Sequence, residues 1–196
     1  RGEVTQLLPL WAGIPDAPRA HELVYRTVLD SGRYWRAFGL PVVPADDPAY
    51  RPGREGGAGG TWMPWNAMII DGLVAYGYRS EAAELFTRLM QAIVGSARSD
   101  RCFREAYNAD APQGLGARHD LAGAAPVHSL LRILGIDLAS PTRLHVEGTS
   151  PFDRPITVRW RGLEIQREAD RTRVTFPDGE QIEFDGEEPR WIEQTG

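Results

Sequence analysis

The sequence predicts a mainly α-helical protein that carries a small β appendage. Through most of residues 1–140, apolar residues recur every three or four positions, the period of a helix with one buried face. From about Pro141 onward, apolar and polar residues alternate, which is the period of a half-buried strand. We therefore expect two domains, a helical one over residues 1–140 and a small antiparallel β domain over residues 141–196.

Two helical segments are expected near the N-terminus, followed by a long loop. The apolar opening VTQLLPLWAGI ends at Gly13, and Asp16 is expected to cap a second helix that has Pro18 in its first turn. After it, four prolines between Pro41 and Pro52, and the run GREGGAGG over residues 53–60, leave no room for regular structure. Loops of this length inside a compact domain often carry function.

The middle of the chain predicts two consecutive helices. In the first, apolar residues recur at helical spacing over residues 65–76, and Gly77 is expected to end it. In the second, Ser80 is expected to be the N-cap, the apolar face covers residues 85–93, and Gly95 is expected to stop the helix.

A further loop, a fifth helix and several strands complete the expected organisation. The stretch FREAYNADAPQGLGARHD, residues 103–120, is interpreted as a loop with one glutamate between aromatic residues. LAGAAPVHSLLRILG after it is interpreted as a helix that ends at Gly135. Alternation over residues 156–165, and before the turn signals PDG and DG, predicts strands joined by hairpin turns.

The composition excludes several classes of function. The net charge is −5, and no basic stripe for nucleic acid is present. The one cysteine, Cys102, allows neither an intrachain disulfide framework nor a cysteine zinc cluster, which is consistent with the cytoplasm. No apolar run approaches the ~18 residues that a membrane span needs. We expect no nucleic acid or membrane partner, no metal and no cofactor.

Trp62, Trp65 and Asn66 stand at the start of the third predicted helix, directly after the glycine-rich loop. Trp62 and Asn66 are four residues apart and would share one helix face. An indole offers a flat apolar surface to a sugar ring, and an amide can donate to and accept from hydroxyls. The alternative is that both tryptophans belong to the core and that Asn66 caps the helix.

Glu105 lies between Phe103 and Tyr107 in the loop over residues 103–120. A positioned carboxylate can act as a general base. Proximity to Tyr107 would fix its orientation, although side chains two apart in an extended segment face together by default. The alternative is a solvated surface glutamate, which is the usual environment of this residue type.

The motifs GTWMPWNAMIIDGLVAYGYRSEAAEL and FREAYNADAPQGLG resemble the C-terminal half of the six-hairpin (α/α)6 toroid glycosidases. The group they resemble most is glycoside hydrolase family 63, which includes processing α-glucosidases and mannosylglycerate hydrolases and is related to trehalases. The openings LLPLWAGIPD and FGLPVVPADDPAY are similar to that family as well, so the resemblance covers about residues 1–136. It implies that residues 1–140 are the C-terminal part of a toroidal catalytic domain.

The resemblance also implies roles for individual residues. Glu105 would be the general base that activates a water in an inverting glycosidase acting on an α-linked glucoside or mannoside. Trp62 and Asn66 would line the sugar pocket, together with Trp65 and Tyr107. His119 would either replace a sugar contact or be a capping or solvated side chain.

A complete enzyme of this kind also needs a general acid, which in the family lies upstream of the residues seen here. The visible aspartates are interpreted as ordinary loop, turn and helix residues: Asp46, Asp47, Asp71 and Asp110. Five predicted helices also fall short of the roughly twelve in a toroid. We therefore expect the chain to work with an N-terminal half of the same enzyme or with a partner subunit.

Two alternatives to hydrolysis remain at this point. The segments before Trp62 and after Gly116 depart from the family pattern, which favours a catalytically inactive carbohydrate-binding or assembly protein on the same toroid. The second alternative is another reaction on that scaffold, such as phosphorolysis or epimerisation.

Overall fold

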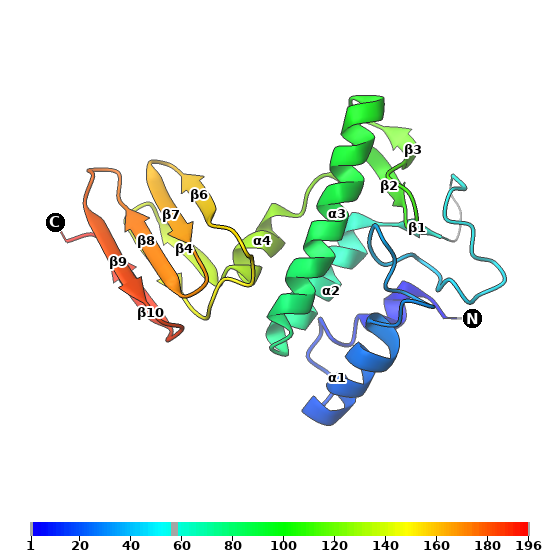
Figure 1. The fold of residues 1–196 in the computed structure, drawn as a ribbon, viewed down its shortest axis with the longest axis horizontal. Helices are drawn as coiled ribbons and strands as arrows, with labels where there is room; N and C mark the ends of the chain where they lie inside the picture. Colours follow the sequence, from blue (N-terminus) through cyan, green and yellow to red (C-terminus); the bar gives the residue numbers. More distant parts are fainter. Residues whose placement is uncertain (1, 56–58, 196) are drawn as a thin grey trace. The chain divides into compact units, whose positions relative to one another are not determined.

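The computed structural model describes residues 2–55 and 59–195 and divides the chain into two compact units, Arg1–Ser129 and Leu130–Gly196 (Figure 1). Residues 56–58 of the glycine run, which the sequence predicts to be loop, lie outside the described residues. These are the N-terminal unit and the C-terminal unit.

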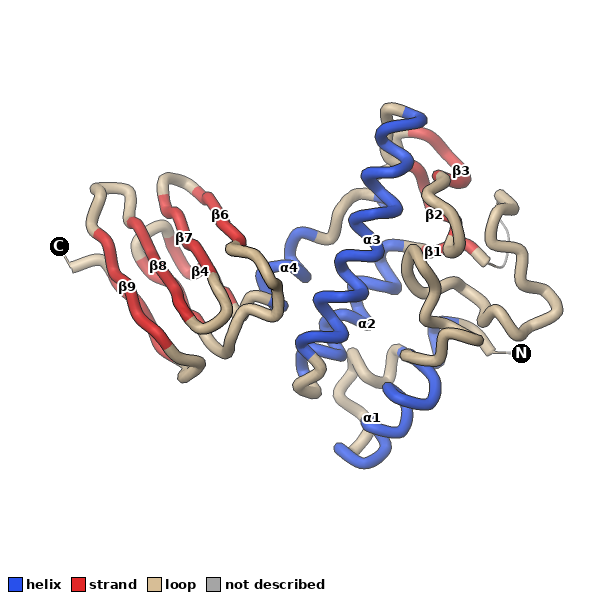
Figure 2. The backbone as a smooth tube through the Cα atoms, viewed as in Figure 1, coloured by secondary structure: helices blue, strands red, loops and turns tan. Residues whose placement is uncertain are grey.

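The predicted fold class, mainly α, is wrong. The described residues form four α-helices and ten strands, and the strands make three antiparallel sheets (Figure 2). Two of the sheets belong to the C-terminal part of the chain, but the third, β1–β2–β3, lies in the N-terminal unit, where the sequence predicts only helices and loops.

The N-terminal unit begins with short helical segments. The opening is a 3-10 turn, η1 (Val4–Leu7), and helix α1 (Ala17–Leu23) runs on into a π-helical turn, η2 (Val24–Val28). Asp16 caps α1 as predicted, since its carboxylate accepts the Arg19 N–H at 3.0 Å.

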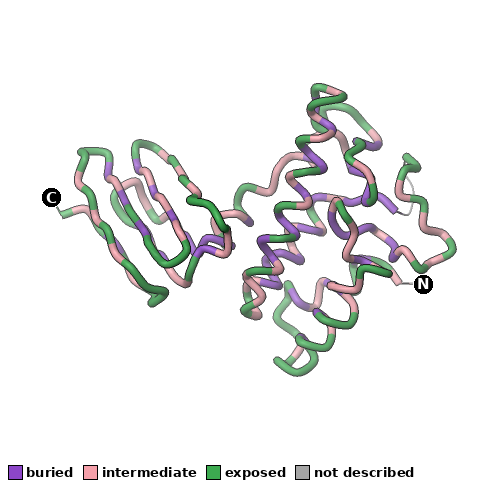
Figure 3. The backbone as a smooth tube through the Cα atoms, viewed as in Figure 1, coloured by how far each residue is buried: buried purple, intermediate pink, exposed green. Residues whose placement is uncertain are grey.

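Helix α2 (Met63–Ala75) is the buried centre of this unit, and α3 (Arg79–Asp100) packs beside it (Figure 3). Gly72 has no side chain to keep the opening segment away: a Cβ on it would lie 2.7 Å from the Trp11 nitrogen. Gly95 does not end α3 as predicted. Pro112 packs against Gly95, and the helix continues to Asp100, where Arg101 in a left-handed conformation terminates it.

The stretch predicted to be a loop over residues 103–120 contains two strands. Strands β2 (Arg104–Asn108) and β3 (Gly114–Arg118) form an antiparallel hairpin, and β2 also pairs with the short β1 (Gly60–Thr61). These strands are short and rich in polar or glycine residues, so they show no period-2 pattern in the sequence. Strand β1 lies at the C-terminal end of the long loop. The fifth predicted helix is divided into a 3-10 turn, η3 (Leu121–Gly123), and a short helix, α4 (Val127–Ile133).

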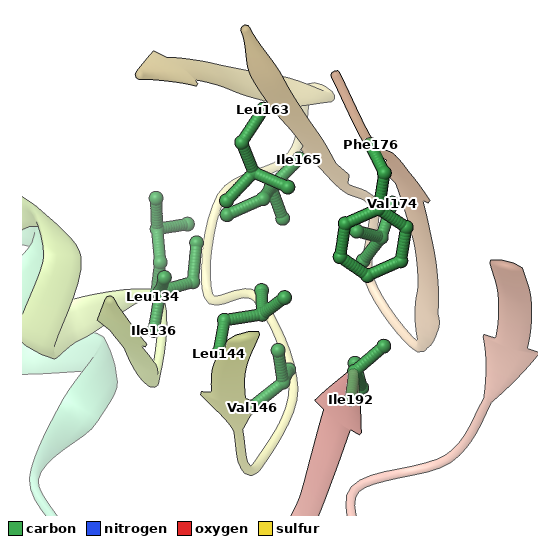
Figure 4. Close-up of a cluster of buried hydrophobic side chains, with 9 residues drawn as sticks. All are labelled: Leu134, Ile136, Leu144, Val146, Leu163, Ile165, Val174, Phe176 and Ile192. Carbon is green, nitrogen blue, oxygen red and sulfur yellow. The ribbon is translucent and has the colours of Figure 1, made fainter. Parts of the chain in front are cut away.

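The C-terminal unit is built from two facing antiparallel sheets. One has the order β10–β5–β4 and the other β6–β7–β8–β9. The strands are β4 (Ile136–Ser140), β5 (Arg143–Val146), β6 (Ile156–Trp160), β7 (Leu163–Arg167), β8 (Arg171–Thr175), β9 (Gln181–Asp185) and β10 (Arg190–Glu193). Figure 4 shows the buried side chains between the two sheets: Leu134, Ile136, Leu144, Val146, Leu163, Ile165, Val174, Phe176 and Ile192.

Asn66 fastens the long loop of the N-terminal unit to helix α2. Its side chain is fully buried, and its Oδ1 accepts the Leu40 N–H at 2.8 Å. Its Nδ2 donates to the carbonyls of Leu40, at 3.0 Å, and Trp62, at 2.9 Å. Both amide hydrogens are therefore used by the backbone, and a loop without regular structure is tied to the first turn of a helix.

Replacing Asn66 with alanine should lower the free energy of unfolding by about 2–3 kcal/mol, because the buried Leu40 N–H and carbonyl lose their partner and the Trp62 carbonyl keeps only the backbone N–H of residue 66. Urea denaturation followed by circular dichroism measures this change. Gln91→Ala, an exposed position on α3, is the control and should change the free energy by less than about 0.5 kcal/mol. Equal losses in the two variants would contradict the anchoring role of Asn66.

Phe176 is the largest apolar side chain of the C-terminal core and is 1% exposed. Phe176→Ala should destabilise this unit by about 3–5 kcal/mol, because it removes buried apolar surface and leaves a cavity. Hydrogen exchange of the amides in β7 and β8 reports this loss locally. Phe184→Ala, which truncates a partly buried phenylalanine, should cost less, and protection unchanged in Phe176→Ala would refute the assignment of Phe176 to the core.

Candidate functional site

Glu105 lies on β2 and turns its side chain toward β3. The residue is half-buried, and its Oε2 accepts the Ala117 N–H at 3.0 Å. Among residues 2–55 and 59–195, no hydrogen bond reaches the other oxygen, Oε1. One carboxylate oxygen is therefore held by the backbone, while the other is left for a solvent molecule or a ligand.

A bulge in β3 creates this contact. Arg104 pairs with Arg118, but Ala106 pairs with Leu115, so two residues of β3, Gly116 and Ala117, face the single residue Glu105. Gly116 has a φ of 74°, as in the type of bulge whose first residue is a left-handed glycine. The bulge exposes the Ala117 N–H to the glutamate instead of to a neighbouring strand.

A small hollow lies next to the Glu105 carboxylate. The described residues that line it are Arg54, Gly60, Trp62, Glu105, Ala106, Leu115 and Gly116. Its volume is about 10 Å³, which is at the lower limit of what a cavity needs to hold one water molecule. Trp62 reaches the hollow because it directly follows β1, which pairs with β2 through Thr61 and Tyr107.

Tyr107 is fully buried, and its hydroxyl is hydrogen-bonded to the backbone. Its hydroxyl donates to the Gly123 carbonyl at 2.7 Å and accepts the Arg104 N–H at 3.4 Å. Burial raises the pKa of the Tyr107 hydroxyl, so the group stays neutral. The side chain thus joins β2 to η3 and does not line the hollow.

The structure brings together Glu105 and Trp62, but not the other predicted site residues. Asn66 is occupied by the backbone, and the half-buried Trp65 is not among the described residues that line the hollow. His119 is exposed in a left-handed turn, φ 59°, and its N–H donates to the Phe103 carbonyl.

Several residues that line the hollow could not be predicted from the sequence. Gly60, Arg54 and Leu115 come from the glycine-rich loop and from β3, and no local pattern marks them. Gly116 had a signal in the sequence, since it is the second glycine of Gly-Leu-Gly directly before Ala117.

An ion-paired cluster lies past the far end of β2. Asp110 accepts Arg36 Nε at 2.8 Å and the Tyr50 hydroxyl at 2.9 Å, which ties the long loop to the β2–β3 turn. The hydrogen bond to Asp110 raises the pKa of the Arg36 guanidinium. Burial raises the pKa of the Tyr50 hydroxyl, and the hydrogen bond to Asp110 raises it further. An open groove of about 860 Å³ begins here and includes Trp35 and Arg88, whose guanidinium lies 4.8 Å from the indole centroid.

Comparison with solved structures shows a fold shared with larger enzymes. The chain is similar to a sialidase, with a TM-score of 0.61 and 12% identity over 95% of this chain and 19% of that chain. It is also similar to neutral trehalase Nth1 from Saccharomyces cerevisiae, with a TM-score of 0.52 and 21% identity over 66% of this chain and 23% of that chain. At such identities the likeness concerns the fold, and the chain spans less than a quarter of either protein.

Comparison of sequences identifies the family. None of the curated proteins matches the chain. In the described part of the chain, no helix is both long and apolar enough to cross a membrane. Residues 2–119, which include Trp62, Glu105 and Gly116, match a family model of glycoside hydrolase domains, so the resemblance to glycosidases inferred from the motifs is confirmed. Since this match covers more than half of the 196 residues, the chain belongs to the mannosylglycerate hydrolase MGH1-like glycoside hydrolase domain family.

Proposed function

We propose that this chain supplies the general base, Glu105, and part of the sugar pocket of an inverting glycoside hydrolase. The substrate class is an α-linked glucoside or mannoside, and the name of the family, mannosylglycerate hydrolase, favours a mannoside. The observation that carries the proposal is the meeting of a carboxylate and an indole, Glu105 and Trp62, at a hollow of about 10 Å³.

The chemistry follows from the two oxygens of the carboxylate. With Oε2 held by the Ala117 N–H, Oε1 is available to accept a proton from a water in the hollow. That water then attacks the anomeric carbon, its proton passes to Glu105, and the bond from the anomeric carbon to the leaving oxygen breaks. A general acid protonates the leaving oxygen on the opposite face of the sugar.

The size of the hollow assigns it to the water rather than to the sugar. A sugar ring would lie at its mouth, where Trp62 offers an apolar face. The acid must stand ~6.5–9.5 Å from the base in an inverting enzyme. The proposal assigns this acid to polypeptide beyond these 196 residues, from a preceding part of the same enzyme or from a partner subunit.

Glu105→Gln tests the role of the base, because an amide cannot accept the proton from water. In the protein as it occurs natively, kcat should fall by about 10²–10⁴-fold. The probes are mannosylglycerate, 4-nitrophenyl α-glucoside and 4-nitrophenyl α-mannoside. Glu22→Gln, at an exposed position on α1, is the matched control and should keep full turnover. Near-normal kcat in Glu105→Gln would remove Glu105 from the mechanism.

The stereochemistry of the product tests the inverting mechanism separately. If Glu105 activates a water, the first sugar released from an α-glycoside is the β anomer. Proton NMR of the anomeric signals during the first minutes of the reaction distinguishes the two anomers before mutarotation mixes them. Release of the α anomer would show retention, and Glu105 would then have to be a nucleophile or a bystander.

A carbohydrate-binding protein without catalysis is the second candidate. The groove beside Asp110 favours it, because it is open, far larger than the hollow, and combines an indole with charged groups, Trp35 with Arg36, Arg88 and Glu84. Calorimetry with the same glycosides separates the two candidates. The second candidate is supported if the glycosides bind without turnover, if Trp35→Ala abolishes this binding, and if Glu105→Gln leaves it intact.

A further inference from the structure

We propose that Gly116 is a positioning residue for Glu105. Its left-handed conformation forms the bulge that presents the Ala117 N–H to Oε2, and its missing side chain leaves the space that the carboxylate occupies. The inference rests on the proposed role of Glu105 as the general base.

The space above Gly116 is filled by the glutamate itself. A Cβ placed on Gly116 would lie 2.3 Å from Oε2 of Glu105, 2.9 Å from its Cβ and 3.0 Å from its Cδ. The three nearest atoms all belong to Glu105. Any side chain at residue 116 would therefore displace the carboxylate. The positive φ of 74° independently favours glycine.

The hydrogen bond from Ala117 selects a single orientation of a flexible side chain. A glutamate has several rotamers of similar energy, and fixing one has an entropic cost that the charge-assisted N–H···O bond offsets. Because Oε2 is directed to the backbone, Oε1 is the oxygen left for the hollow, which Gly116 also lines. The bulge thus decides which oxygen acts on the water.

Gly77 offers a matched control in the same unit. It also has a positive φ, 85°, but a Cβ on it would meet nothing within 4 Å. Gly77→Ala and Gly116→Ala therefore share the cost of a left-handed alanine, whereas only Gly116→Ala collides with Glu105.

The first test is a thermal denaturation cycle that needs no substrate. Gly116→Ala should lower the Tm more than Gly77→Ala does. In a Glu105→Ala background, which removes the Oε2 and Cδ contacts, that extra loss should shrink by at least half. Should Gly116→Ala fail to fold, the double variant should recover a cooperative transition. Equal losses for both glycines, or a Gly116→Ala loss that Glu105→Ala does not relieve, would overturn the proposal.

The second test is turnover of the family substrate, mannosylglycerate, and the two 4-nitrophenyl α-glycosides. Gly116→Ala should lower kcat by about 10²-fold with KM nearly unchanged, because a base displaced by about 1 Å loses that much. In a Glu105→Gln background it should lower kcat no further, whereas a merely structural defect would act in both backgrounds.

The two tests separate this inference from the proposed function. If Glu105→Gln keeps its turnover while the denaturation cycle shows coupling, Gly116 positions the glutamate but the base is another group. If Glu105→Gln is inactive while Gly116→Ala keeps full kcat, Glu105 is the base and the positioning role of Gly116 is refuted.

Discussion

The candidate site depends on one buried amide. Asn66 hydrogen-bonds the N–H and carbonyl of Leu40 and the carbonyl of Trp62, so it joins the long loop to the first turn of α2. A buried amide that uses both of its N–H donors on backbone carbonyls is a strong constraint in a low-dielectric interior. Because β1 precedes Trp62 and pairs with β2, the same constraint sets where the indole meets Glu105.

The reach of local sequence patterns explains which parts of the fold could be predicted. Helix α2 and strands β6–β9 show their period within a single segment, and they form as expected. Strand β1 has two residues, and β2 reads Arg-Glu-Ala-Tyr-Asn. Neither has a period to detect, and the pairing partner of β1 lies more than 40 residues away along the chain.

The contacts of the predicted site residues were harder to predict than their positions in the chain. The Trp-x-x-x-Asn and Phe-x-Glu-x-Tyr motifs each contribute one residue to the hollow, yet spacing cannot tell whether an amide or a hydroxyl faces a ligand or the backbone. Asn66 and Tyr107 are fully buried and hydrogen-bonded to carbonyls, which only the tertiary structure reveals. Gly116 illustrates the same limit. The sequence shows a glycine, but only the structure shows that Glu105 on the neighbouring strand occupies the space of a side chain at this position.

A common logic connects the two motifs. In each, one residue, Trp62 or Glu105, lines the hollow, and a second, Asn66 or Tyr107, lies one helical turn or one strand repeat later and hydrogen-bonds the backbone beside it. Asn66 binds the carbonyl of Trp62 itself, and Tyr107 accepts the N–H of Arg104, the neighbour of Glu105. Sites that hold a reacting group within a fraction of an ångström need such support, since the lining side chain alone cannot fix its own backbone. Each motif therefore combines a residue that lines the hollow, Trp62 or Glu105, with a residue, Asn66 or Tyr107, that hydrogen-bonds the neighbouring backbone.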